Sequence, residues 1–237
     1  MNFIYRFICW LNRMLDGFRV FDFLAPLAIR LYLAPIFFVA GMNKYADLES
    51  TTEWFGNAEW GLGLPYADIL AKLATGTEII GAVLLVLGLA VRWVSIPLMI
   101  TMAVAALKVH FHNGWQFIAD TSSAFASPKL GPLAFEDMSG TIERLQKARE
   151  ILQEHGNYGW LTEKGNIVIS NNGMEMAVTY FIMLLVLFFM GGGKVFSIDF
   201  WLRRRCPQKK IKTKTVVQPE PPNPTASSIA PAADPAE

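Results

Sequence analysis

Long apolar stretches dominate the hydrophobic pattern of the chain. A bilayer core needs about 20 mostly apolar residues per helix, and four stretches approach or reach that length: residues 21–42, 68–90, 92 to about 110, and 174–190. The second and third are joined by a very short turn, which predicts a tight antiparallel hairpin. Residues 79–90 and 177–190 have no polar face to present to water, which argues against a soluble helical bundle.

Composition supports a membrane protein. Of the 237 residues, 53% are hydrophobic and only 17% are charged, whereas soluble domains have about 25% charged residues. The net charge of +1 points to no acidic or basic partner, and no nucleic-acid surface is evident. Cys9 and Cys206 lie near opposite ends of the chain, so neither a disulfide framework nor a cysteine metal site is expected.

The distribution of lysine and arginine predicts the topology. Basic residues concentrate in the N-terminal arm, at Arg92 in the short turn, and after the fourth stretch. The first loop and the long loop of residues 111–173 are net acidic. Under the positive-inside rule, both termini are cytoplasmic and both larger loops are outside. We therefore expect a multi-pass protein of the bacterial cytoplasmic (inner) membrane.

The expected fold class is all-α, an antiparallel four-helix transmembrane bundle with an N-terminal interfacial helix. Residues 1–20 form an amphipathic helix suited to the inner interface, or alternatively to a partner subunit. Residues 21–202 form the transmembrane domain, and residues 203–237 form a basic, then disordered, cytoplasmic tail. In the outer loop we expect a surface helix over 141–154 and a small hairpin from 158–161 and 166–169.

Several segments resemble the DoxX family of membrane proteins. They are residues 27–44 (LAIRLYLAPIFFVAGMNK), residues 77–89 (TEIIGAVLLVLGL), and the sequences NGME at 172–175 and SID at 197–199. The resemblance covers roughly residues 24–202 except the loop interior; Met174, where tyrosine is more usual, and the long outer loop depart from it. It implies a four-helix inner-membrane protein. Some members are linked to oxidoreductase complexes, and a related family supplies a membrane subunit of thiosulfate:quinone oxidoreductase.

Two ionisable residues fall inside the apolar stretches. From a rise of 1.5 Å per residue, Arg30 lies roughly 13 Å and Glu78 roughly 18 Å from the inner ends of their helices. Intramembrane charges usually pair inside the bundle, so we expect Arg30 and Glu78 to form an ion pair. The pair could hold a cofactor or simply fasten two helices together.

A second cluster is expected near the outer surface, where His110 ends the third stretch and Glu175 begins the fourth. Lys108, Lys44, His112 and Lys72 could lie nearby. A histidine beside a carboxylate can exchange protons near neutral pH, which suits the headgroup of a quinone. The alternative is an ordinary hydrated interface, and a metal site is not expected.

These observations predict a quinone-linked membrane subunit of an oxidoreductase complex, although whether the chain is itself an enzyme stays open. The candidate catalytic residues are His110, Glu175 and Lys108, and the candidate cofactor-binding residues are Arg30, Glu78 and Lys44. The cofactor is open, with quinone as the candidate. The expected partners are the lipid bilayer, a redox subunit and a second copy of the chain. The alternatives are a non-catalytic scaffold or assembly protein and, less favoured, a small transporter.

Overall fold

The computed structural model describes residues 3–120, 123 and 139–205. Within these ranges the regular structure is helical, and one isolated antiparallel bridge joins Ile118 to Ser170. The predicted all-α class is therefore confirmed. Most of the predicted disordered tail, from Cys206 onward, lies outside the described residues.

Three helices are long and apolar enough to cross a membrane. The first two are α2 (Leu24–Ala46) and α4 (Ala67–Leu87). The third span, Val91–Asn113, consists of α5 (Val91–Val104), a π-helical segment η2 (Ala105–His110) and a short 3-10 turn η3 (Phe111–Asn113). The fourth apolar helix, α8 (Glu175–Met190), is shorter at 16 residues. Three spans of the predicted four thus have the required length and composition.

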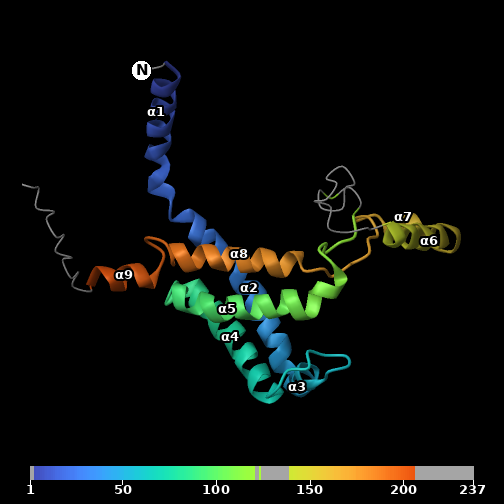
Figure 1. Cartoon of the computed structure of the whole chain (residues 1–237). Helices are drawn as coiled ribbons and strands as arrows, with labels where there is room; N and C mark the ends of the chain where they lie inside the picture. Colours follow the sequence, from blue (N-terminus) through green and yellow to red (C-terminus); the bar gives the residue numbers. More distant parts are fainter. Residues whose placement is uncertain (1–2, 121–122, 124–138, 206–237) are drawn as a thin grey trace, which may run out of the picture. The chain divides into compact units, whose positions relative to one another are not determined.

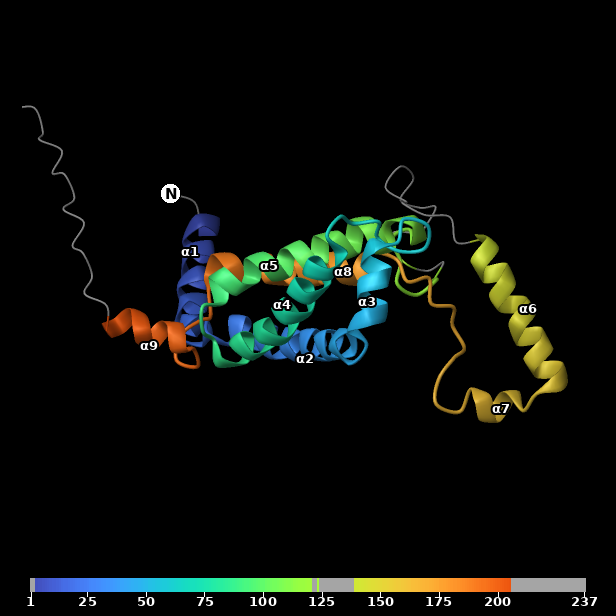
Figure 2. The ribbon, with the colours of Figure 1, turned by 90° about the horizontal axis from the view of Figure 1, so that it is seen from below.

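These helices pack in pairs. α2 packs against α4, and α8 runs alongside α5, as Figures 1 and 2 show. α4 and α5 meet at the tight turn between them, where Gly88 and Ala90 both have positive φ angles. The shared core consists of buried side chains from all four helices, including Leu33, Phe37, Leu85, Leu98, Leu184 and Leu187.

Six further helical segments complete the described chain: α1 (Phe3–Asp16), η1 (Gly17–Phe21), α3 (Leu48–Gly56), α6 (Ser139–His155), α7 (Tyr158–Leu161) and α9 (Ile198–Arg205). The predicted helices at the N-terminus and in the outer loop are present as α1 and α6. The membrane-interface position of α1 stays a prediction, although its side chains from Ile4 to Asp16 are all exposed.

The predicted hairpin in the outer loop is wrong, because its first arm is the short helix α7. The side chain of Asn157 explains the difference. It accepts a hydrogen bond from the backbone N–H of Trp160 at 3.3 Å, which is the usual way an asparagine caps the start of a helix. Asp47 caps α3 similarly, accepting from Ser50 N at 3.1 Å.

Candidate functional site

Arg30 is a residue of α2 and is fully buried beside the end of α4 that leads into the turn. Its Nε donates to Leu85 O at 2.6 Å and its Nη2 to Val86 O at 2.9 Å. Its Nη1 donates to two carbonyls of the segment after α8, Gly192 O at 2.5 Å and Phe196 O at 3.0 Å. The guanidinium therefore joins three segments: α2, the end of α4, and the chain that leaves α8.

The predicted ion pair between Arg30 and Glu78 is wrong. The last carbonyls of a helix have no partner within the helix and carry partial negative charge. Those of α4 stand beside Arg30 and satisfy it. Glu78 lies seven residues before Leu85, about 10 Å back along the helix.

Asp199 completes this end of the structure. Its carboxylate accepts hydrogen bonds from Ala90 N at 2.7 Å and Val91 N at 3.0 Å, so it caps the start of α5. Ser197 Oγ donates to Gly88 O at 2.8 Å. The SID sequence at residues 197–199 is part of the resemblance to the DoxX family, which predicts no role for these two side chains. These contacts hold the segment after α8 against the turn between α4 and α5, so we assign the two residues a structural role.

Glu78 instead pairs with Lys44. Lys44 Nζ lies 2.6 Å from Glu78 Oε2, and the Glu78 side chain is almost completely buried. Gly41 makes this approach possible, because a Cβ atom there would lie 2.7 Å from Ile79 Cγ1 on α4. Lys44 follows Gly41 by about one helical turn and so comes next to Glu78.

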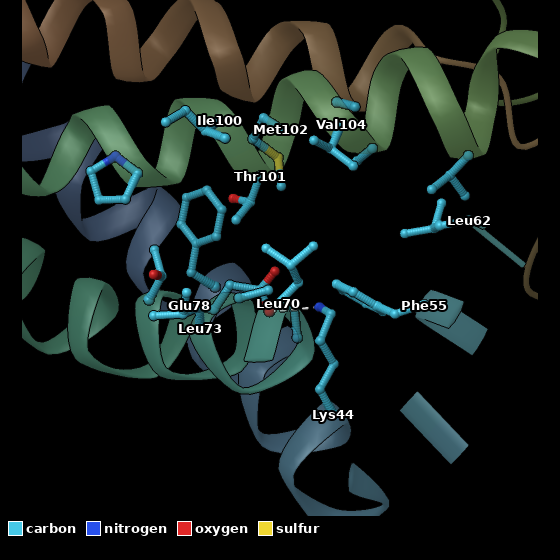
Figure 3. A pocket seen from close by; sticks show the side chains of 18 of the residues that line it. Lys44, Phe55, Leu62, Leu70, Leu73, Glu78, Ile100, Thr101, Met102 and Val104 are labelled. Atoms are coloured by element: carbon cyan, nitrogen blue, oxygen red, sulfur yellow. Dashed lines mark hydrogen bonds and ion pairs between the residues drawn. The ribbon is translucent and has the colours of Figure 1, made fainter. Parts of the chain in front are cut away.

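The Lys44–Glu78 pair borders a cavity of about 690 Å³ (Figure 3). Side chains of α2, α3, the segment between α3 and α4, α4, α5, η2 and α8 line it. Most are apolar, and among them are Phe55, Leu62, Leu70, Leu73, Ile100, Met102 and Val104. The polar side chains in the lining are Lys44, Thr77, Glu78, Thr101, His110 and Tyr180.

The cavity brings together three of the six predicted site residues: Lys44, Glu78 and His110. The π-helical segment η2 carries His110, and its Nδ1 lies 2.9 Å from Asn172 O. A carbonyl oxygen can only accept, so Nδ1 bears the hydrogen and Nε2 of the neutral ring is left as an acceptor. This tautomer keeps a basic nitrogen on a residue of the cavity wall.

The other three predicted residues lie outside the cavity lining. Arg30 makes the four hydrogen bonds to backbone carbonyls described above, which we call the clamp. Glu175 Oε2 accepts from Phe117 N at 3.0 Å, and Lys108 is exposed. Lys72, a further member of the predicted cluster, forms an exposed pair with Asp68 at 2.7 Å. The outer cluster is therefore divided between the cavity and the surface.

Chemically, the cavity offers hydrogen bonds at one place in an apolar enclosure. An ammonium group has three donors, and a carboxylate has two acceptor oxygens. Lys44 and Glu78 use one of each on one another, so the pair can also donate to a carbonyl and accept from a hydroxyl.

Comparison with known protein families identifies the part of the chain that contains Lys44 and Glu78. Residues 25–111 match the family model named DoxX. The chain contains a DoxX domain. This domain includes Arg30, Lys44, Glu78 and His110, whereas Glu175 lies beyond it.

A curated relative also matches part of the chain. Over 86 residues, or 36% of this chain, the sequence is 34% identical to a Bacillus subtilis (strain 168) protein named "Putative oxidoreductase CatD". The match spans 60% of that protein's length. No solved structure matches the chain. The DoxX domain and its apolar helices make this a membrane protein.

Proposed function

We propose that this DoxX-domain protein binds a quinone in the cavity beside Lys44 and Glu78, as the quinone-linked membrane subunit of an oxidoreductase complex. The observation that carries the proposal is the ion pair between half-buried Lys44 and buried Glu78 at the wall of a largely apolar cavity. Small-molecule sites typically enclose about 300–1,000 Å³ and combine apolar walls with a few polar groups that orient the ligand. The cavity volume of about 690 Å³ falls within this range.

A quinone headgroup suits the chemistry of this wall. Its ring is flat and apolar, and its two carbonyl oxygens accept hydrogen bonds. Lys44 is the donor for one carbonyl, and Glu78 becomes an acceptor when that oxygen is reduced to a hydroxyl. The name of the curated relative supports a redox context.

Reduction of a quinone takes two electrons and two protons. The electrons come from a redox partner subunit. His110 passes the protons to the quinone one at a time, because its Nε2, a basic nitrogen of a ring in the cavity wall, can take up a proton and then donate it. Glu175 and Lys108 are proposed to supply protons from the adjacent outer surface. Arg30 has no place in cofactor binding, since four of its five N–H donors are used on backbone carbonyls and it is not part of the cavity lining.

The proposal includes the predicted topology. α8 is the fourth span, and its 16 residues, about 24 Å long, need only modest local thinning of the bilayer. The transmembrane domain is residues 21–202 of an inner-membrane protein with both termini cytoplasmic. The helix of residues 1–20 lies in the inner interface, and the basic segment that begins at Arg203 faces anionic lipid.

Purification from native membranes in a mild detergent tests this function. We expect a bound quinone and a redox subunit to accompany the protein. A quinone-free protein with a non-redox partner would favour the scaffold alternative.

In membranes from a deletion strain, His110→Ala should lower quinone-linked turnover at least about 100-fold, since general acid–base catalysis typically contributes about 10²–10⁴-fold. Its melting temperature should stay at the wild-type value. His155→Ala is the matched control, because His155 is exposed on α6. Equal turnover in the two variants would remove His110 from the reaction.

A further inference from the structure

The cavity lies where α4 and α5 separate. Near the turn the two helices are in close contact, because a Cβ atom on Gly81 would lie 3.1 Å from Leu98 Cδ1. Farther from the turn, side chains of both helices line the cavity instead of meeting each other. Figure 3 shows Ile100 and Thr101 of α5 on one side of the cavity, and Leu73 and Glu78 of α4 on the other.

Two of these side chains mark an opening. Leu73 on α4 and Ile100 on α5 both line the cavity, yet each is 59% exposed. Phe37 and Glu78, which line the same cavity, are buried. A residue that both lines a cavity and reaches the surface stands at its rim. The cavity therefore opens outward between α4 and α5.

The position of this rim along the helices determines what it faces. Leu73 lies six residues after the start of α4, about 9 Å from that end. Ile100 lies nine residues after the start of α5, about 13 Å from the opposite end. A hydrocarbon core is about 30 Å thick, so both residues lie at the depth of the acyl chains. The opening faces lipid rather than water.

We propose that the opening between Leu73 and Ile100 is a lateral portal, through which a long-tailed quinone enters from the bilayer. In the bound state its headgroup reaches Lys44 and Glu78, and its isoprenoid tail leaves between the two rim residues. The inference rests on the proposed function. It narrows the ligand class to membrane-dissolved quinones with an apolar tail, in place of water-borne solutes.

The test compares two ligands with one headgroup, one with an isoprenoid tail and one without, binding to the full chain in nanodiscs. The portal variants are Leu73→Trp and Ile100→Trp. Their matched controls are Ile80→Trp on α4 and Leu107→Trp on η2, because these side chains are 60% and 63% exposed but do not line the cavity.

The portal variants should bind the tailed quinone at least about tenfold more weakly, since an indole overfills the exit. They should bind the tailless ligand as the wild type does, and the controls should bind both ligands normally. Wild-type affinity of the portal variants for the tailed quinone overturns the portal, as does equal weakening of both ligands. If the unaltered protein binds neither ligand, the proposed function itself fails.

A second measurement uses the unaltered protein and does not depend on the folding of any variant. A quinone with a photoreactive diazirine at the start of its tail is bound and irradiated, and the labelled peptides are identified by mass spectrometry. We expect labels on the peptides that contain Leu73 or Ile100. Labels confined to α8 or α3 overturn the portal.

Discussion

Replacement of Arg30 by methionine tests the clamp at the end of α4 most sharply. Methionine retains an unbranched apolar chain but donates no hydrogen bond. Four buried or partly buried carbonyls, those of Leu85, Val86, Gly192 and Phe196, would lose their donor. We expect Arg30→Met to lower the free energy of unfolding substantially.

The magnitude follows from the number of bonds. A hydrogen bond to a charged group contributes about 1.5–3 kcal/mol in soluble proteins, whereas polar contacts between transmembrane helices average about 0.6 kcal/mol. Four bonds then correspond to a loss of about 4 kcal/mol, between these two limits. Arg30→Lys should recover only part of this loss, because one ammonium group cannot reach carbonyls that a planar guanidinium spans.

The assay is unfolding in mixed micelles with increasing sodium dodecyl sulfate, followed by circular dichroism. Arg92→Met is the matched control, because Arg92 is exposed and donates one hydrogen bond, to Phe189 O at 2.8 Å. We expect that control to lose about 1 kcal/mol, a quarter of the loss at Arg30, because it removes one hydrogen bond instead of four. If Arg30→Met unfolds at the same detergent fraction as Arg92→Met, the clamp is not a major source of stability.

Two further predictions concern the approach of α2 to α4. Gly41→Ala should destabilise the protein by about 1–3 kcal/mol, because its Cβ would meet Ile79. Gly76→Ala, which has nothing within 4 Å, should be neutral or stabilising, and equal thermal melting of the two variants would contradict the close approach. Arg30→Met and Glu78→Leu should have additive effects within about 0.5 kcal/mol, because their hydrogen bonds run to different groups. A coupling of several kcal/mol between the two substitutions in the same detergent assay would instead support a direct ion pair between Arg30 and Glu78.

The apolar runs of the sequence located the spanning helices well. The first was expected over residues 21–42 and is Leu24–Ala46; the second was expected over 68–90 and is Ala67–Leu87. The second ends early because Gly88 takes a left-handed conformation that closes the helix. Length and hydrophobicity are properties of one helix, so one sequence suffices to estimate them.

The partners of the buried charges could not be found in the same way. Counting residues gives a depth along each helix, but neither its rotation nor its distance from a neighbour. Arg30 binds backbone carbonyls, which every residue has and no side-chain pattern reveals. Lys44 was recognised as a candidate, yet the signal for its true partner was Gly41, whose missing side chain brings Glu78 within reach.

Binding of a short-tailed quinone, measured by titration calorimetry on the full chain in nanodiscs, tests the central claim most directly. The site variant is Lys44→Met/Glu78→Leu, which removes both charges and so leaves no unpaired charge in the membrane. The matched control is Lys72→Met/Asp68→Leu, an exposed ion pair on α4. We expect saturable binding by the wild type and the control, and at least about tenfold weaker binding by the site variant. Equal binding by all three proteins would contradict the assignment of the cavity beside Lys44 and Glu78 as the quinone site.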